Sequence, residues 1–423
     1  MKKLICPICI IALISCNNSP KEKKSEPAEM PVNKEKLLAP TPPMGWNSWN
    51  WFGKKDINEK IMYEVIDAID QSGLKTAGYE YVVIDGGWRD TKLGENGALL
   101  AHPVKFPNGI KPLADYAHSK GLKFGLHTVP GTADCINDPV GGYGNEEVQI
   151  QQFVDWGIDF VKIDRCRFEG GWDLDILHKT YAKWKRLLEE KSDRDVLISI
   201  SAYEWFDWNA EIGQMARTTE DISAKVSGMS GNDAQFDGQI PEENNAWGLL
   251  TVMEIAEENN KWATYAGNGY WNDPDMLVTG EHGLTFAEQK SHFALWCIMS
   301  SPLMLGNDPR NMSEEEKSII LNKDAISINQ DPTEQGKRII KNTDTEVWAK
   351  NLKDNQVAVL LLNRNQENKK NIALNLEDVG IFQKINIKDV YAGKDIGTAS
   401  GLISHDTPPK SSLFLLLSKT VDQ

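Results

Sequence analysis

Charged and polar side chains end several apolar runs in the first part of the chain. The residues concerned are Asp85, His127, Asp164, Ser201 and Asp221. An Asp that ends an apolar run must be solvated or paired, so packing alone explains such a set poorly. Carboxylates gathered at one place can instead divide between them the roles of nucleophile and general acid–base.

Asp164 has the surroundings of a carboxylate that is held as an anion. Lys162 lies two residues earlier, and the alternation of side chains along a strand puts both on the same face. A nearby cation stabilises a carboxylate as the anion. The alternative is that Asp164 and Lys162 form a purely structural ion pair.

The elements that position these residues follow from the hydrophobic pattern. From Thr41 to about Leu305, short β-rich apolar runs alternate with amphipathic stretches, which indicates a parallel sheet with crossover helices. A (β/α)8 barrel would gather the polar residues, because the carboxyl ends of its strands face the active site. An open doubly wound sheet would gather fewer, and no glycine-rich phosphate motif supports one. We predict strands at 81–85, 122–127, 160–164 and 196–201, and helices at 57–77, 110–120, 146–156, 173–191, 207–216, 244–259 and 285–299.

After about residue 330 the pattern changes to short apolar runs separated by Asn, Asp, Gly and Pro, with no good amphipathic helix between them. This pattern predicts a small antiparallel β-sandwich. The predicted fold is therefore α/β, with a (β/α)8 TIM barrel over residues 41–328 and a C-terminal antiparallel β-sandwich over residues 329–423.

The amino terminus has the pattern of an export signal. Lys2 and Lys3 precede an apolar run that is too short to span a membrane. The ending Leu13-Ile14-Ser15-Cys16 resembles a bacterial lipobox, which implies removal of residues 1–15 and acylation of Cys16; an ordinary secretory signal cut nearby is the alternative. Residues 16–40 are predicted to form a flexible tether. We expect the protein in the bacterial cell envelope, bound to the membrane through the lipid alone.

Composition limits the classes of partner. The chain has 40% hydrophobic and 25% charged residues, which is typical of a soluble globular protein. Its formal charge of −15 would repel the negatively charged phosphate backbone, so nucleic acid is not expected as a partner. The 14 Trp outnumber both the 12 Phe and the 10 Tyr. They either fill a large core or stack on sugar rings, and those in motifs near strand ends are Trp46, Trp49, Trp88, Trp205 and Trp271.

Three of the six cysteines, Cys135, Cys166 and Cys297, lie beyond the predicted signal and lipid site. Export through an oxidising compartment favours one disulfide and one free thiol. Cys297 lies in an apolar run and is predicted to be a buried, inert thiol. No Cys/His spacing resembles a zinc site.

Several segments, in the right order, resemble glycoside hydrolase family 27, the retaining α-galactosidase family. They are Thr41-Pro-Pro-Met-Gly-Trp-Asn-Ser-Trp49, Lys105-Phe-Pro-Asn-Gly109, Gly121-Leu-Lys-Phe-Gly125, Phe160-Val-Lys-Ile-Asp-Arg-Cys166 and Trp271-Asn-Asp-Pro-Asp-Met-Leu277. The tail fits the family's C-terminal sandwich.

The resemblance implies a pair of catalytic carboxyl groups, which a retaining hydrolase holds about 5 Å apart. It assigns Asp164 as the nucleophile. The segment Arg217-Thr-Thr-Glu-Asp-Ile222 resembles the family's acid/base segment, which assigns Asp221 as acid/base and Arg217 as a ligand of sugar hydroxyls. Glu220 is a rival for the acid role, but strand alternation points only one of the two neighbours inward, and we favour Asp221.

The same resemblance implies further substrate-binding residues. Trp49 would stack on or bound the sugar, Asp85 would bind hydroxyls on the C4–C6 side, and Lys162 would reach O3 and O4. Glu204 would lie near the C2 substituent and Asp275 would line the pocket. As alternatives, Asp85 and Glu204 are solvated loop residues and Asp275 is structural.

The resemblance also implies a disulfide between Cys135 and Cys166, with two free thiols as the alternative. No metal and no organic cofactor is implied, because carboxylates fill both catalytic roles.

One segment departs from the family. Typical members read Asp-Asp-Cys-Trp where this chain reads Asp85-Gly86-Gly87-Trp88, so a second carboxylate is missing. A charged hydrogen bond contributes about 1.5–3 kcal/mol, so its loss would weaken recognition of galactose. The glycines are expected to leave space for a different or substituted sugar. His127 stands where many relatives carry Tyr; it either supplies the lost hydrogen bond or is a satisfied polar residue at the rim.

The sequence therefore predicts a retaining exo-glycosidase that removes terminal α-D-galactosyl residues from an oligosaccharide or polysaccharide. A β-L-arabinopyranosidase is the first alternative, because that sugar has galactose stereochemistry without the exocyclic CH₂OH group. α-N-Acetylgalactosaminides and isomalto-type glucans also remain open as substrates. A different class of protein, a catalytically inactive carbohydrate-binding lipoprotein, is the second alternative.

Overall fold

The computed structural model describes residues 37–135, 138–167, 173–223 and 250–420. The predicted signal, Cys16 and most of the predicted tether lie outside these residues. Within the described ranges, the helices are all too short or too polar to cross a membrane.

Eight parallel strands form the first domain, in the order β7-β6-β5-β4-β3-β2-β1-β8. A parallel bridge between Leu277 and Leu305 links the chain just after β7 to β8, which brings the two ends of the sheet together. The predicted barrel is confirmed. Its strands are β1 (Met44–Asn47), β2 (Tyr81–Ile84), β3 (Lys123–Thr128), β4 (Phe160–Asp164), β5 (Leu197–Ser201), β6 (Met215–Arg217), β7 (Trp271–Asp273) and β8 (Leu303–Leu305).

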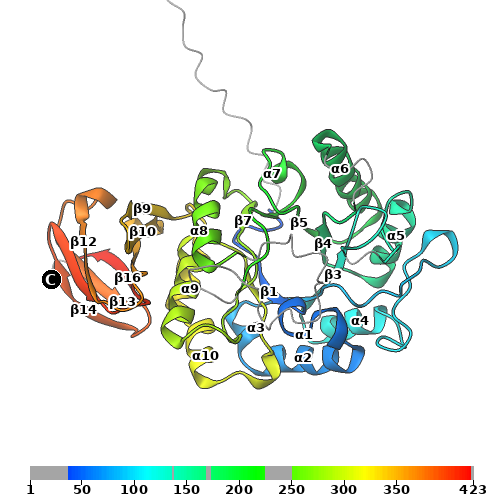
Figure 1. The fold of residues 1–423 in the computed structure, drawn as a ribbon, viewed down its shortest axis with the longest axis horizontal. Helices are drawn as coiled ribbons and strands as arrows, with labels where there is room; N and C mark the ends of the chain where they lie inside the picture. The colour runs from blue at the N-terminus through cyan, green and yellow to red at the C-terminus, as the bar shows by residue number, and fades with distance from the viewer. Residues whose placement is uncertain (1–36, 136–137, 168–172, 224–249, 421–423) are drawn as a thin grey trace, which may run out of the picture. The chain divides into compact units, whose positions relative to one another are not determined.

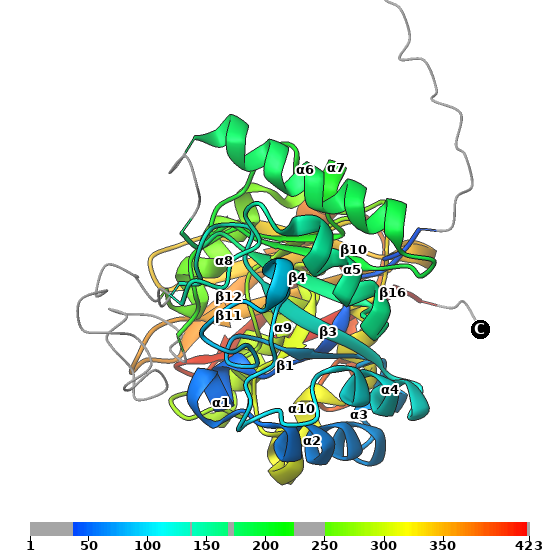
Figure 2. The ribbon, with the colours of Figure 1, turned by 90° about the vertical axis from the view of Figure 1, so that its right-hand side faces the viewer.

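Helices cover the outside of the barrel, and Figures 1 and 2 show α4, α5 and α6 outside β3 and β4. Three of the helices begin at capping boxes, with Thr251, Thr285 and Ser313 as the N-caps. The helices are α1 (Trp49–Asp56), α2 (Glu59–Gln71), α3 (Leu74–Ala77), α4 (Lys111–Ser119), α5 (Glu146–Trp156), α6 (Leu174–Lys191), α7 (Asn209–Ile212), α8 (Val252–Lys261), α9 (Phe286–Ile298), α10 (Glu314–Ile320) and α11 (Lys323–Asn329).

The predicted helix at 207–216 is wrong in its second half. The helix α7 ends at Ile212, and Gly213 follows in an extended conformation. Met215 and Ala216 then pair with Ser199 and Ile200 as strand β6. A three-residue strand carries too little alternation to be recognised beside a helical pattern.

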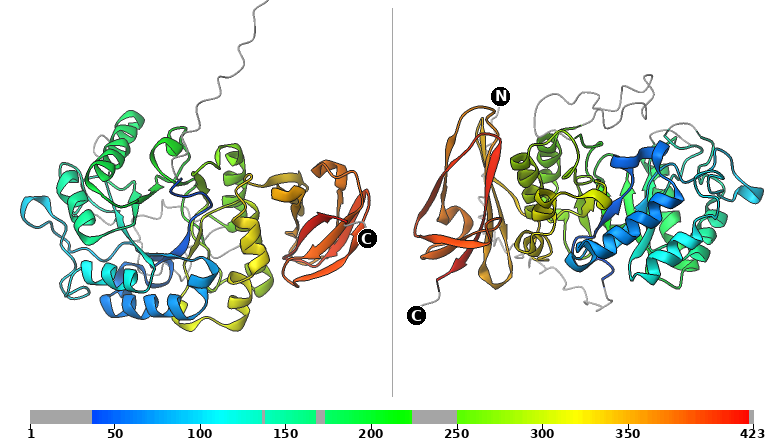
Figure 3. Two further views of the ribbon diagram at one scale, coloured as in Figure 1. Left: turned by 180° about the vertical axis from the view of Figure 1, so that it is seen from behind. Right: turned by 90° about the horizontal axis from the view of Figure 1, so that it is seen from below.

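Two antiparallel sheets form the C-terminal domain, as predicted (Figure 3). The six-stranded sheet has the order β14-β13-β16-β11-β10-β9, and β12 pairs with β15 in the second sheet. The strands are β9 (Lys337–Lys341), β10 (Thr345–Asn351), β11 (Val357–Asn363), β12 (Lys370–Asn375), β13 (Ile385–Asp389), β14 (Lys394–Ala399), β15 (Leu402–Thr407) and β16 (Ser411–Lys419).

Strand β11 is buried along its whole length because it faces two cores. Val359 and Leu361 belong to the core of the sandwich, together with Ile372 of the small sheet. Leu360 and Leu362, which point the other way, belong to the core of the barrel. This explains why the strand is continuously apolar rather than alternating.

Lys350 links the two domains from a fully buried position in β10. Its ammonium donates hydrogen bonds to the carbonyl oxygens of Ile328, Asn329 and Asp331, at the end of α11. These carbonyls follow the last helix of the barrel and would otherwise lack partners.

We expect Lys350→Met to destabilise the protein by about 2–5 kcal/mol, because it leaves buried carbonyl groups unsatisfied. The exposed Lys337→Met in β9 is the matched control, and its effect should be within about 0.5 kcal/mol. Thermal unfolding followed by circular dichroism compares the two. Equal unfolding midpoints would contradict the anchoring role of Lys350.

Candidate active site

Asp164 is the last residue of β4 and is buried at the carboxyl end of the barrel. Its Oδ2 lies 3.1 Å from Nε2 of His127, which is on the neighbouring strand β3. Burial alone would raise the pKa of Asp164, but the Lys162 cation and the hydrogen bonds from His127 and Tyr203 outweigh it and lower the pKa. Asp164 is therefore held as an anion.

Lys162 interacts with two carboxylates, those of Asp85 and Asp164. Its ammonium is 2.8 Å from Oδ2 of Asp85, which also accepts a hydrogen bond from Asn47 at 2.9 Å. Burial opposes both charges, yet the mutual attraction raises the pKa of Lys162 and lowers that of Asp85. The ends of β1, β2 and β4 thus hold a fixed pattern of charge, and Asp85 is not a solvated loop residue.

The surroundings of Asp164 lower its pKa, whereas Asp221 has surroundings that raise its pKa. Its Oδ1 accepts a hydrogen bond from Arg217 at 3.0 Å, whereas its neighbour Glu220 is exposed. Partial burial raises the pKa of Asp221 to about 6, and the carboxylates of Asp275 and Asp164 add to this against the attraction of Arg217 and Lys162. Asp221 can therefore hold a proton under conditions in which Asp164 has none.

Asp275 orients the segment that carries Asp221. Its Oδ2 accepts the backbone N–H of Ile222 at 2.9 Å, and its Oδ1 is 3.2 Å from Arg217. Its φ of +80° is costly for a residue with a Cβ, and such strain is retained where the surroundings require it. Asp275 therefore has a structural role and contacts the segment that carries Asp221.

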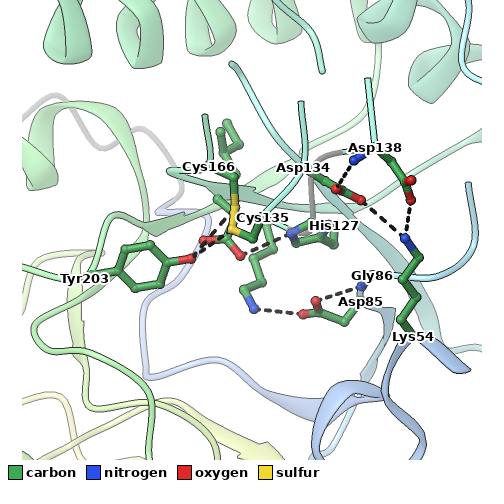
Figure 4. Close-up of a disulfide and its surroundings, with 12 residues drawn as sticks. Lys54, Asp85, Gly86, His127, Asp134, Cys135, Asp138, Cys166 and Tyr203 are labelled. Atoms are coloured by element: carbon green, nitrogen blue, oxygen red, sulfur yellow. Dashed lines mark hydrogen bonds and ion pairs between the residues drawn. A yellow bond between two sulfur atoms is a disulfide. The ribbon is translucent and has the colours of Figure 1, made fainter. Parts of the chain in front are cut away.

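A disulfide joins Cys135 to Cys166, the pairing that the resemblance implied, and Cys297 is a free buried thiol. A carboxylate oxygen of Asp164 lies within 4.8 Å of both sulfur atoms. The hydroxyl of Tyr203 points toward the same bond, 3.6 Å from the Cys135 sulfur and 3.9 Å from the Cys166 sulfur (Figure 4). The disulfide thus braces the loop that follows Asp164.

We expect replacement of both Cys135 and Cys166 by Ser to cost about 3–4 kcal/mol of stability, since the bond spans a sequence separation of 31 residues. Turnover should also fall, because the loop next to Asp164 loses its brace. Cys297→Ala, which removes a cysteine elsewhere, should have the smaller effect on turnover. Thermal unfolding and turnover of the two variants check this; an unchanged unfolding midpoint in the double Ser variant would contradict it.

The glycines after Asp85 leave no open space, so that expectation is wrong. A Cβ at Gly86 would lie 3.0 Å from a ring carbon of Trp49. A Cβ at Gly87 would lie 2.6 Å from the carbonyl oxygen of Lys54, and the φ of +100° at Gly87 suits glycine. Beside Asp85, where the resemblance implied a second carboxylate in typical family members, this chain therefore presents an aromatic ring.

Glu204 lies at the edge of the site, with its side chain 58% exposed and one carboxylate oxygen 2.6 Å from the guanidinium of buried Arg165. Three of the tryptophans near strand ends are fully buried, and each donates its indole N–H to a backbone carbonyl: Trp46, Trp88 and Trp271. They belong to the core and cannot stack on a sugar. Trp205 stacks on Trp262 instead, with ring centroids 4.2 Å apart.

Two residues of the site were missed from the sequence. Tyr203, two residues past β5, has a φ of +64° and contacts Asp164 and the disulfide. Arg89 is buried next to Trp88, and its guanidinium is 3.4 Å from Nδ1 of His127. Their place just after predicted strand ends was the available signal.

Comparison with known proteins gives a consistent result. The family model described as "Alpha galactosidase A" matches residues 41–331, and "Alpha galactosidase C-terminal beta sandwich domain" matches residues 342–417. The α-galactosidase of Cyamopsis tetragonoloba is 38% identical over 376 residues, covering 88% of this chain and 84% of the relative. The α-galactosidase A of Cellvibrio japonicus is 38% identical over 339 residues, covering 79% and 78%. The crystal structure of α-galactosidase I from Mortierella vinacea superposes with a TM-score of 0.83 at 30% identity, covering 92% of this chain and 99% of that one.

Proposed function

Because this chain belongs to the α-galactosidase family of glycoside hydrolases, family 27, we propose that it removes terminal α-D-galactosyl residues from oligosaccharides or polysaccharides with retention of configuration. One observation carries the proposal. Two carboxyl groups that follow strand ends of the barrel have pKa values shifted in opposite directions, lowered for Asp164 and raised to about 6 for Asp221. Such a pair provides the nucleophile and the general acid of a retaining hydrolase.

The reaction proceeds in two displacements. A carboxylate oxygen of Asp164 attacks the anomeric carbon, and the glycosidic bond breaks as Asp221 donates its proton to the departing oxygen. Asp221, now a carboxylate, then takes a proton from water. The oxygen of that water attacks the same carbon and releases Asp164.

The surrounding charges support recognition of a neutral, hydroxyl-rich sugar. Lys162 and Asp85 offer a charged donor and acceptor side by side, and Arg217 lies beside Asp221. Trp49 bounds the sugar on the side where Gly86 follows Asp85. Both ring nitrogens of His127 are occupied by protein partners, so it does not replace the missing hydroxyl ligand.

Comparison of aryl α-D-galactoside with aryl β-L-arabinopyranoside and aryl α-N-acetylgalactosaminide tests the substrate. The galactoside should have the highest kcat/KM. An arabinopyranoside value tenfold or more above the galactoside value would reject galactose in favour of the pentose. An inactive binding protein would turn over none of the three and would form no covalent adduct with a fluorinated galactosyl substrate.

We further propose that the chain is a lipoprotein of the bacterial cell envelope, acylated at Cys16. The support is the segment Leu13-Ile14-Ser15-Cys16 after a short apolar run. Expression with labelled palmitate should label the wild type in the membrane fraction, and Cys16→Ala should remove the label. Full labelling of Cys16→Ala would contradict the proposal.

A further inference from the structure

Two buried residues, Trp88 and Arg89, contact His127, which in turn contacts Asp164. The indole of Trp88 donates to the carbonyl oxygen of His127 at 3.0 Å, which fixes its backbone. Arg89, 4% exposed, follows directly; one nitrogen lies 3.4 Å from Nδ1 of His127 and another 3.4 Å from the carbonyl oxygen of Val140. The His127 ring therefore lies between a guanidinium on one side and Asp164 on the other.

This arrangement determines where the imidazole proton resides. A guanidinium has only donors and stays charged in proteins. Toward Arg89, Nδ1 of His127 must therefore act as the acceptor. The single proton of the neutral ring then lies on Nε2, the nitrogen that is 3.1 Å from Oδ2 of Asp164.

We propose that Arg89 is a positioning residue for catalysis, which keeps His127 neutral with its proton on Nε2, so that Asp164 accepts a hydrogen bond from a neutral imidazole and not from an imidazolium. The inference rests on the proposed function, in which Asp164 is the nucleophile. With an imidazolium, both partners would be charged, and the hydrogen bond would become an ion pair that holds the carboxylate more strongly. That bond would hold the carboxylate in its ground state and oppose its attack on the anomeric carbon.

The other charges near these rings do not replace Arg89. The carboxylates that act on Arg89 are Asp134, Asp85, Asp138 and Asp164. Each of them favours a second proton on a nearby imidazole, since it is an anion. Lys162 is already paired with Asp85, and Lys54 with Asp134 and Asp138. Arg89 is the cation in direct contact with His127 among the described residues.

Nitrogen-15 NMR of histidine-labelled resting enzyme reads the proton positions directly, and His127→Gln assigns the signals. In the wild type we expect Nε2 protonated and Nδ1 unprotonated at neutral pH. Arg89→Met should give an imidazolium or a mixture of tautomers, whereas Arg89→Lys, which keeps the cation, should preserve the wild-type form. A proton on Nδ1 in the wild type, or unchanged signals in a folded Arg89→Met, would overturn the proposal. If Arg89→Met does not fold, the wild-type and Arg89→Lys spectra decide.

A double-mutant cycle gives the functional readout. Arg89→Met should lower kcat on aryl α-galactoside by about tenfold in the wild-type background, within the usual range for residues in contact. In the His127→Gln background, whose neutral amide needs no tautomer control, the same change should cost less than twofold. Equal losses in both backgrounds would mean that Arg89 does not act through His127. Because the NMR result needs no turnover, failure of the galactosidase proposal would be seen separately, as an enzyme inert on galactosides.

Discussion

Asp164→Asn is expected to abolish turnover, with a loss of about ten-thousand-fold or more in kcat on aryl α-galactoside. A neutral amide has no anionic oxygen to attack the anomeric carbon, so the covalent intermediate cannot form. The surroundings of Asp164 favour an anion at this position, since the Lys162 cation and the hydrogen bond from His127 both lower its pKa. A fluorinated galactosyl substrate should label the wild type on the peptide containing Asp164 and should leave the variant unlabelled.

The matched control is Asp155→Asn on the exposed surface of α5, which makes the same chemical change away from the site. Its turnover should equal that of the wild type. Circular dichroism should show both variants folded. Retention of more than about one per cent of the wild-type kcat by Asp164→Asn would assign the nucleophile to another residue.

Asp221→Ala should separate substrates by their leaving groups. A poor leaving group needs protonation as the bond breaks, so turnover of an unactivated galactoside should fall by about 10²–10⁴-fold. An activated aryl galactoside should lose much less in its first displacement. Azide, which attacks without base assistance, should partly restore turnover of the activated substrate. Wild-type activity of Asp221→Ala on the unactivated substrate would reject Asp221 as acid/base, and Glu220→Ala serves as the control because that neighbour is exposed.

The pH dependence follows from the same residue. Asp221 must carry its proton to act as the acid, and its pKa is raised to about 6. We therefore expect kcat/KM of the wild type on an unactivated galactoside to fall as the pH rises above about 6. In Asp221→Ala this alkaline limb should disappear. An alkaline limb at the same pH in the variant would mean that another group controls it.

Much of the fold could be predicted because its long elements repeat clear patterns. The strands β2 to β5 and helices such as α6 fall within a residue or two of their predicted bounds. The strands β6, β7 and β8 have three residues each, which is too few for alternation to register. They exist because neighbouring strands supply hydrogen bonds, and a single sequence does not display that context.

The candidate site could be predicted where its residues lie close together in the sequence. Lys162 and Asp164 share a strand face, and the structure places both among the same charges. The space assigned to Gly86 was not predictable, because it is filled by Trp49 from another strand end. Arg89 escaped notice for a similar reason, since its partner His127 comes from the next strand of the barrel.

Strand β11 is apolar on both faces, and this limits how the protein can be truncated or its domains combined with other proteins. Its Leu360 and Leu362 complete the core of the catalytic domain, while Val359 and Leu361 complete that of the sandwich. Truncation before β9 would expose apolar side chains of the catalytic domain to solvent. Transfer of the sandwich to another protein would likewise expose the apolar face that it packs against the barrel. The two domains should therefore be kept together in engineered versions of the protein, and a fusion partner belongs at the carboxyl end, since the amino end carries the proposed export signal.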